Sequence, residues 1–252
     1  MAELRVFDSI DALSEAAAEE LIAIAADAVH ERGVCHIALS GGSTPKRLFQ
    51  ILANRGRAAM PWGQVHLWWG DERTVGPDHA DSNFKMTKDA LIDPLSLEHF
   101  ERIEGEGDPI EAAKAYGAKL ERLKPATDQF PVFDYVMLGM GPDGHTASLF
   151  PNTPALDATS EIVVANPVTS PLTKGATTRI TLTATALNWG RQIRFLVAGA
   201  DKAEPLWQVL RGPRDPKTFP AQLIRANEGH LVWLVDKAAA AKLESSEPGQ
   251  QA

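Results

Sequence analysis

The chain has 252 residues, of which 44% are hydrophobic and 23% are charged, and its formal net charge at pH 7 is −8. This composition is typical of a globular protein with a large core, whereas the acidic balance argues against a nucleic-acid binder, which normally carries a broad basic face. The sequence has no apolar stretch of membrane-spanning length, no signal-peptide pattern and a single cysteine, Cys35, which excludes an internal disulfide. We therefore expect a cytoplasmic protein that binds neither membranes nor nucleic acids.

Helices and strands alternate in the first part of the chain. Residues 10–31 are rich in alanine, with Leu, Ile and Val at helical spacing, which predicts an amphipathic helix that ends at Gly33. The apolar run 34–39 is typical of a strand, and residues 46–55 return to a helical composition. Residues 65–69 predict a second strand.

The middle of the chain continues this alternation. Residues 81–91 begin with a capping segment and predict a helix, and residues 109–123 predict another. The apolar run 133–138 is long enough for one buried strand and too short for most helices. Residues 162–165 and 178–182 predict weaker strands.

The last part of the chain repeats the pattern. Residues 183–188 predict a short helix, residues 194–198 a strand, and residues 203–210 the helix that follows it. Residues 231–235 and 237–243 predict the last strand and the last helix.

Strands that are apolar on both faces and alternate with helices indicate an α/β protein. We expect one Rossmann-like domain over residues 1–243, with a mostly parallel sheet and helices on both faces. Residues 244–252 are polar and are expected to form a disordered tail. Ligands of such sheets bind beyond the carboxyl ends of the strands, so polar segments that directly follow predicted strands should converge on one rim.

The loop 40–45 has the composition of an anion cradle. Gly41 and Gly42 remove side chains, and the helix that follows offers free N–H groups and the positive end of its dipole. The hydroxyl groups of Ser43 and Thr44 add donors. The alternative interpretation is a plain helix cap with a tight turn. The loop matches neither a Walker motif nor a dinucleotide-binding fingerprint.

Charged residues lie after or near the ends of three other predicted strands. Asp71, Glu72 and Arg73 place two carboxylates and a guanidinium on what the sequence indicates is one turn. Arginine binds phosphate through two parallel hydrogen bonds, and an acid beside it can orient it or serve as a base. The alternative is a solvated charged turn, which spacing alone does not exclude. Arg179 and Lys202 are further cations near strand ends, and each alone is compatible with ordinary surface charge.

The loop 139–148 contains three glycines and a proline around one imidazole, that of His145. Histidine is the side chain best suited to move a proton near neutral pH, and Asp143 stands two residues before it. The alternative is a hydrogen-bonded structural histidine. The other histidines lack metal-ligand spacing, so the sequence predicts no zinc site.

Taken together, these segments resemble the 6-phosphogluconolactonase family, a branch of the larger glucosamine-6-phosphate isomerase/6-phosphogluconolactonase superfamily. The matching segments occur in the family's order and span most of the chain: residues 39–45, 69–75, 81–83, 139–151, 178–181 and 199–202.

The resemblance implies hydrolysis of 6-phospho-D-glucono-1,5-lactone to 6-phospho-D-gluconate. His145 would activate a water molecule as general base, with Asp143 or another carboxylate fixing its tautomer. The resemblance implies no metal and no organic cofactor, and a small phosphorylated sugar lactone as ligand. The sequence does not define the oligomeric state, and we expect a monomer or weak oligomer. The implied substrate-binding residues are Gly41, Gly42, Ser43, Thr44, Asp71, Arg73, Arg179 and Lys202.

Two alternative functions remain open at this point. The sister branch contains sugar-phosphate deaminases, which usually carry a tyrosine where this chain has Arg73 and a glutamate in the stretch that corresponds to residues 148–151. That stretch has no carboxylate in this chain, which favours the lactonase branch. The second alternative is a non-catalytic sugar-phosphate-binding regulator. The presence of His145 beside Asp143 and the absence of a visible DNA-binding segment argue against it.

Overall fold

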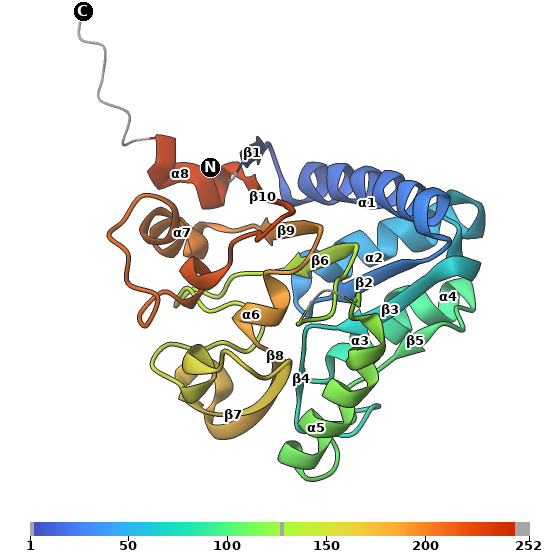
Figure 1. Cartoon of the computed structure of the whole chain (residues 1–252). Coiled ribbons are helices and arrows are strands. Elements are labelled where there is room, and N and C mark those ends of the chain that lie inside the picture. Colours follow the sequence, from blue (N-terminus) through green and yellow to red (C-terminus); the bar gives the residue numbers. More distant parts are fainter. Residues whose placement is uncertain (1–2, 127–128, 245–252) are drawn as a thin grey trace, which may run out of the picture.

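The computed structural model describes residues 3–126 and 129–244. Its centre is a seven-stranded sheet in the order β1-β10-β9-β6-β2-β3-β5, and every neighbouring pair of strands is parallel (Figure 1). The strands of this sheet are β1 (Glu3–Phe7), β2 (Cys35–Leu39), β3 (Val65–Trp69), β5 (Phe100–Glu101), β6 (Tyr135–Leu138), β9 (Gln192–Val197) and β10 (His230–Asp236).

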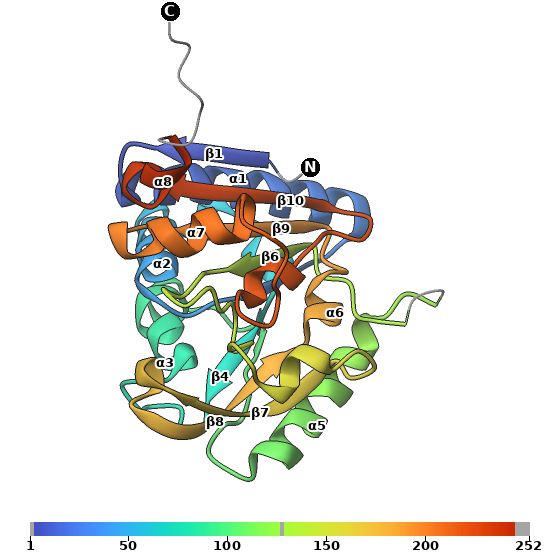
Figure 2. The ribbon, with the colours of Figure 1, turned by 90° about the vertical axis from the view of Figure 1, so that its left-hand side faces the viewer.

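Helices cover both faces of this sheet, as two perpendicular views show (Figures 1 and 2). Helices α1 and α2 pack against each other on one face, and α6 and α7 lie on the other. The α-helices are α1 (Ile10–Arg32), α2 (Ser43–Arg55), α3 (Asn83–Thr87), α4 (Asp93–Leu95), α5 (Pro109–Leu120), α6 (Ala184–Leu187), α7 (Ala203–Leu210) and α8 (Lys237–Glu244). A π-helical turn, Lys88–Ile92, joins α3 to α4.

A second, three-stranded sheet has the order β4-β8-β7 and is antiparallel throughout. Its strands are β4 (Asp71–Arg73), β8 (Gly175–Leu182) and β7 (Val163–Ser170). Helix α5 packs against β7 and β8. The chain passes from the large sheet into the small one at Gly70, whose N–H donates to the carbonyl of Leu39 and whose carbonyl accepts from the N–H of Leu182.

The structure confirms the predicted fold class. It also corrects local details. Residues 71–73 form strand β4 and not a turn, because their backbone pairs with β8 once the chain has left β3. The weak strands predicted at 162–165 and 178–182 are longer than expected and belong to the small sheet. Strands β1 and β5 were not predicted. Glu244 ends helix α8, and the rest of the predicted tail lies outside the described residues.

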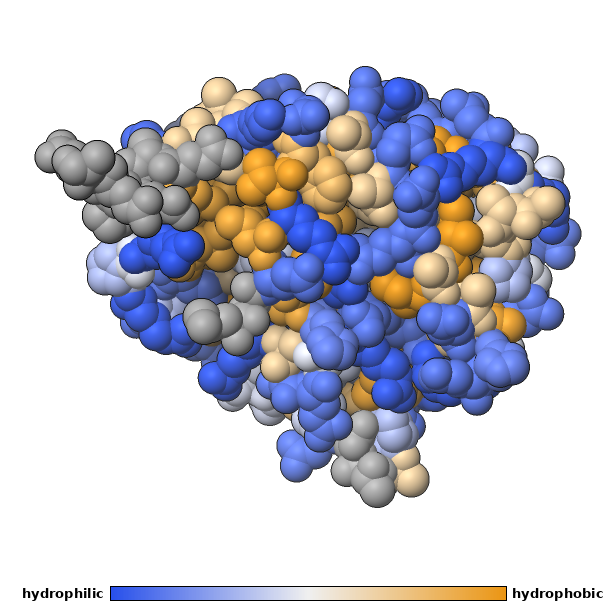
Figure 3. Space-filling model, turned by 90° about the horizontal axis from the view of Figure 1, so that it is seen from above, coloured by the Kyte–Doolittle hydropathy of each residue, from blue (hydrophilic) through white to orange (hydrophobic). Residues whose placement is uncertain are grey.

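The large sheet is buried between its helices. Strand β6 is fully buried along its length, which agrees with its continuous apolar sequence. Within the described part of the chain, no helix is both long enough and apolar enough to cross a lipid bilayer. Seen from above, the surface is mostly hydrophilic, with apolar side chains in smaller patches (Figure 3).

Candidate functional site

A cavity of about 290 Å³ lies at the carboxyl edge of the parallel sheet. Residues that follow β2, β6 and β9 line it, together with residues of β4, which continues the chain beyond β3. Strands β2 and β6 are neighbours in the sheet. From β2 the chain continues to β3 and β5 on one side, and from β6 it continues to β9 and β10 on the other. The cavity therefore lies at the topological switch point of the sheet, where open α/β sheets bind their ligands.

The amino end of α2 forms one wall of the cavity. Gly42 precedes the helix with a φ of 108°, which favours glycine, and no side chain caps the helix. A Cβ at Gly41 would lie 1.9 Å from Oδ1 of Asn83, so only glycine fits there. Ser43 and Thr44 begin the helix, and their backbone N–H groups have no acceptor within the helix. Because the first turn holds no acidic residue, this wall presents a positive dipole end to the cavity.

Strand β4 places its side chains alternately on two sides. Asp71 and Arg73 line the cavity, whereas Glu72 points away from it and is 2% exposed. The Glu72 carboxylate accepts hydrogen bonds from the backbone N–H groups of Asn83 and Phe84 at the start of α3, both at 2.8 Å. Burial raises the pKa of Glu72 above its ordinary value, although these hydrogen bonds oppose the increase. Glu72 is thus a helix cap and has no access to the cavity.

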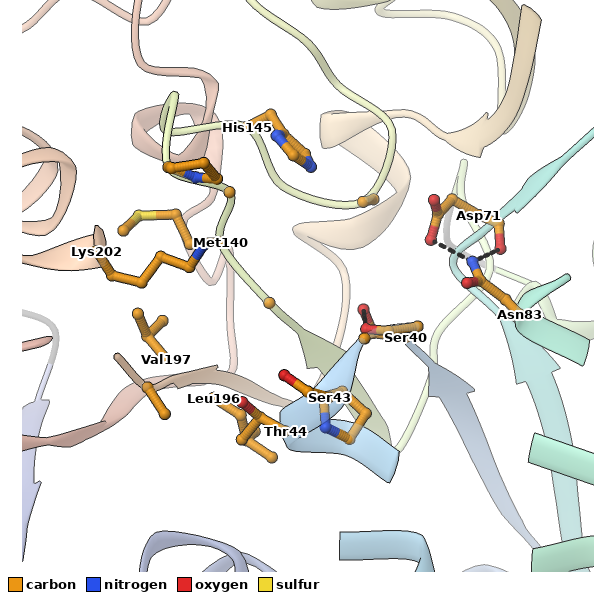
Figure 4. Close-up of a pocket in the computed structure, with 18 of the residues that line it drawn as sticks. Ser40, Ser43, Thr44, Asp71, Asn83, Met140, His145, Leu196, Val197 and Lys202 are labelled. Atoms are coloured by element: carbon orange, nitrogen blue, oxygen red, sulfur yellow. Dashed lines mark hydrogen bonds between the residues drawn. The ribbon is translucent and has the colours of Figure 1, made fainter. Parts of the chain in front are cut away.

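Asp71 is held from both sides by neutral donors. Its Oδ2 accepts from the hydroxyl of Ser148 at 2.6 Å, and the Asn83 amide donates to its backbone carbonyl at 2.9 Å and to Oδ1 at 3.3 Å. In Figure 4, Asp71 and Asn83 lie together at one side of the cavity, across from Lys202. This arrangement presents a fixed carboxylate that can accept a hydrogen bond from a sugar hydroxyl.

The loop after β6 brings His145 into the cavity (Figure 4). Its Nδ1 lies 2.5 Å from Oδ1 of Asp143, which also accepts the backbone N–H of His145 at 3.1 Å. The loop is tight: Gly144 has a φ of 76°, and the N–H of Gly141 donates to the carbonyl of His145 at 2.8 Å. A Cβ at Gly141 would lie 2.0 Å from Nδ1 of the imidazole. The close approach of backbone and imidazole therefore requires glycine at position 141, and the positive φ favours glycine at position 144.

In the pair of His145 and Asp143, one imidazole nitrogen binds the carboxylate and the other faces the cavity. Burial alone would raise the pKa of Asp143, but the hydrogen bond and the charge of His145 outweigh burial and hold that pKa below its ordinary value. Asp143 is thus a carboxylate near neutral pH, and it accepts the proton on Nδ1. Among the described residues, Nε2 of His145 makes no hydrogen bond with the protein, so this nitrogen is free to meet a ligand or water.

Two of the three predicted cations reach the cavity. Arg73 lines it and donates a hydrogen bond to the backbone carbonyl of Asp81. Lys202 also lines it, is 18% exposed at its side chain, and pairs with Asp201 at 2.8 Å. Arg179 lies opposite Arg73 on the neighbouring strand β8 and is not part of the lining. Burial lowers the pKa of Arg179, and the neighbouring charge of Arg73 lowers it further.

The structure thus brings seven of the predicted substrate-binding residues and His145 to one cavity. Asp143 reaches this site through its contact with His145, while Arg179 pairs with Arg73 on the neighbouring strand and does not line the cavity. The sequence predicted no role in the site for Asn83, Ser148 or Phe150, although all three occur in the segments that resemble the family. Ser40, Met140 and Leu172 also line the cavity. In residues 3–126 and 129–244, no three His, Cys, Asp or Glu side chains are grouped so that they could hold a metal ion.

Comparisons with known proteins show the family of this chain. The family model described as "Glucosamine-6-phosphate isomerases/6-phosphogluconolactonase" matches residues 8–233. A 6-phosphogluconolactonase of Synechocystis is 39% identical over 220 residues, which cover 86% of this chain and 88% of that protein.

Two solved structures have the same fold over nearly the whole chain. The crystal structure of a devB protein has a TM-score of 0.85 and 36% identity, and the match covers 96% of this chain and all of that chain. The 6-phosphogluconolactonase of Trypanosoma brucei has a TM-score of 0.86 and 28% identity, and the match covers 96% and 99% of the two chains. The chain belongs to the glucosamine-6-phosphate isomerase/6-phosphogluconolactonase family.

Proposed function

We propose that this protein hydrolyses 6-phospho-D-glucono-1,5-lactone to 6-phospho-D-gluconate, as an enzyme of the oxidative pentose phosphate pathway. The observation that carries the proposal is the position of His145. Its Nδ1 is bound to the Asp143 carboxylate at 2.5 Å, and its ring lines the same cavity as the cations Arg73 and Lys202. The relatives named 6-phosphogluconolactonase support the same reaction.

The reaction is the attack of water on an ester carbonyl. Nε2 of His145 takes a proton from a water molecule, and the resulting hydroxide forms a bond to the carbonyl carbon. Asp143 holds the tautomer in which Nδ1 carries the proton, and its negative charge stabilises the imidazolium that forms. When the C–O bond of the ring breaks, the imidazolium returns the proton to the leaving ring oxygen.

The carbonyl oxygen becomes negatively charged during the attack and needs donors nearby. The backbone N–H groups of the glycine-rich turn after β2 would supply them, because those of Gly141 and Gly144 in the turn after β6 already donate to backbone carbonyls. Each such donor is typically worth about 3 kcal/mol of barrier. A lactone is already a reactive ester, so this stabilisation together with one base is sufficient chemistry without a metal or an organic cofactor.

The phosphate group is distant from the reacting carbon, and its binding positions that carbon in the site. Arg73 and Lys202 are cations that line the cavity and would hold this phosphate, with the hydroxyl groups of Ser43 and Thr44 as neutral donors. Asp71 would accept a hydrogen bond from a sugar hydroxyl. Because the cavity takes residues from both sheets, residues 1–243 would act as one catalytic domain. The buried thiol of Cys35 is compatible with the reducing cytoplasm.

The direct test generates the phosphorylated lactone in situ and follows its disappearance against the spontaneous rate. We expect turnover well above that background, and its absence in the folded protein would refute the proposal. Ammonia release from glucosamine 6-phosphate would instead indicate a deaminase. Binding of 6-phosphogluconate without turnover of the lactone would indicate a non-catalytic regulator.

A further inference from the structure

The imidazole of His145 has an aromatic ring packed on its face. Phe150 lies later in the same loop, and the two ring centroids are 4.2 Å apart with an angle of 18° between the ring planes. Phe150 is 5% exposed, whereas the side chain of His145 retains 20% exposure. One face of the imidazole is therefore covered by a buried phenyl ring, while part of the imidazole remains open to the cavity.

The backbone that carries Phe150 is anchored by residues other than His145. Ala147 has a φ of 47°, which turns the chain sharply. The backbone N–H of Ser148 donates to the hydroxyl of Thr181 on β8 at 3.2 Å. The carbonyl of Phe150 accepts from the hydroxyl of Thr153 at 2.7 Å. These contacts anchor the backbone on both sides of Leu149, and the buried phenyl ring of Phe150 lies against the imidazole.

The hydrogen bond to Asp143 and the stacking on Phe150 constrain different motions of the imidazole. The imidazole is held covalently at Cγ and by one hydrogen bond at Nδ1, which still allow the plane of the ring to tilt. Contact with a flat ring removes this pivot, so that Nε2 keeps one direction toward the cavity. The negative face of the phenyl ring also favours the protonated imidazole.

We propose that Phe150 is a positioning residue for His145. Its ring holds the plane of the imidazole so that Nε2 is directed at the water molecule, and it stabilises the imidazolium formed when that water loses a proton. Phe150 touches neither water nor lactone and acts through His145 alone. This inference rests on the proposed lactonase function.

The experiment compares Phe150→Leu, which removes the aromatic ring and keeps an apolar side chain, with Phe150→Tyr, which keeps the ring. Phe133→Leu is the matched control. Phe133 is also buried, at 0% exposure, and it precedes β6 at the opposite edge of the sheet from the cavity. For each variant we would measure kcat and KM across pH, thermal unfolding, and the NMR signals of the His145 ring protons.

We expect Phe150→Leu to lower kcat about tenfold with KM within about twofold, because binding groups are unaffected and only the base is misdirected. The acid limb of the kcat profile should move about half a pH unit lower, since the imidazolium loses its aromatic neighbour. The ring protons of His145 should lose the upfield shift that the phenyl ring causes. Phe150→Tyr should retain all of these properties, and Phe133→Leu should change only the unfolding temperature.

The proposal is wrong if Phe150→Leu, while folded, keeps the parental kcat and pH profile, or if it loses no more activity than Phe133→Leu does at equal stability. It is equally wrong if the His145 ring protons show no upfield shift in the parent. That NMR readout needs no substrate, so it tests the stacking even if the parent protein does not hydrolyse the lactone, an outcome that would refute the proposed function instead.

Discussion

Replacing Gly141 with alanine tests whether the His145–Asp143 pair must keep its geometry. The added Cβ would lie 2.0 Å from Nδ1 of His145 and 2.7 Å from Oδ1 of Asp143, whereas non-bonded heavy atoms normally stay about 3.5 Å apart. The imidazole must therefore move by roughly 1 Å or more, and a displacement of this size near reacting groups costs about 100-fold in rate. We expect kcat to fall about 100-fold, which is about 2.7 kcal/mol of lost transition-state stabilisation.

The assay is the disappearance of the phosphorylated lactone, corrected for its spontaneous hydrolysis, with thermal unfolding measured in parallel. Gly107→Ala is the control, because a Cβ at Gly107 meets no heavy atom within 4 Å. We expect this control to keep the parental kcat. If folded Gly141→Ala retained kcat within about threefold of the parent, the loop would tolerate the displacement, and the claim that turnover requires a fixed imidazole would be refuted.

Other perturbations separate the roles proposed for the remaining groups. His145→Ala should lower kcat about 10²–10⁴-fold with the fold intact, and Asp143→Asn should lower it in the same direction; near-normal turnover would remove His145 as the base. Arg73→Ala should raise KM about 10–100-fold, more than Arg179→Ala, because only Arg73 lines the cavity; an unchanged preference over unphosphorylated gluconolactone would exclude this role. Burial lowers the pKa of His36 to about 4 from 6.5 in the unfolded chain, so the unfolded state binds more protons between these pH values and stability falls as pH drops through them. The free energy of unfolding, measured with urea, should fall by about 2 kcal/mol from the upper to the lower of these pH values, which is less than the full pKa difference gives because His36 is partly exposed. An equal fall in His36→Gln would show that His36 is not its cause. Dialysis against a chelator should leave turnover unchanged, and a loss restored by added metal would contradict the metal-free mechanism.

The sequence predicted the large parallel sheet well because most of its strands have a clear pattern. Residues 65–69 and 135–138 are apolar runs bounded by polar or glycine-rich segments, and buried parallel strands have this pattern. Strand β1 was missed because its residues are largely exposed and charged residues interrupt it, as is usual for an edge strand. Strand β5 has two residues, too few for any periodic signal.

The candidate site was predicted where glycines and a histidine follow buried strands, and the cavity contains those loops. The roles of residues 71–73 were not separable from sequence, because nothing in three charged residues says that they form a strand with Glu72 on the opposite side. That assignment depends on pairing with β8, more than a hundred residues later. The stack of Phe150 on His145 likewise depends on how the loop folds back, which side-chain identity alone does not specify.

The two-sided character of β4 has a consequence for how this family can vary in length. Deleting one residue beside Gly70 would shift the phase of the strand, so that the helix-capping acid would face the ligand while the two residues that now line the cavity would turn into the interior. A substitution in β4 would weaken individual contacts. An insertion or deletion would instead exchange the side of the strand that lines the cavity with the side that caps α3. We therefore expect natural length variation to avoid the segment from β3 to β4.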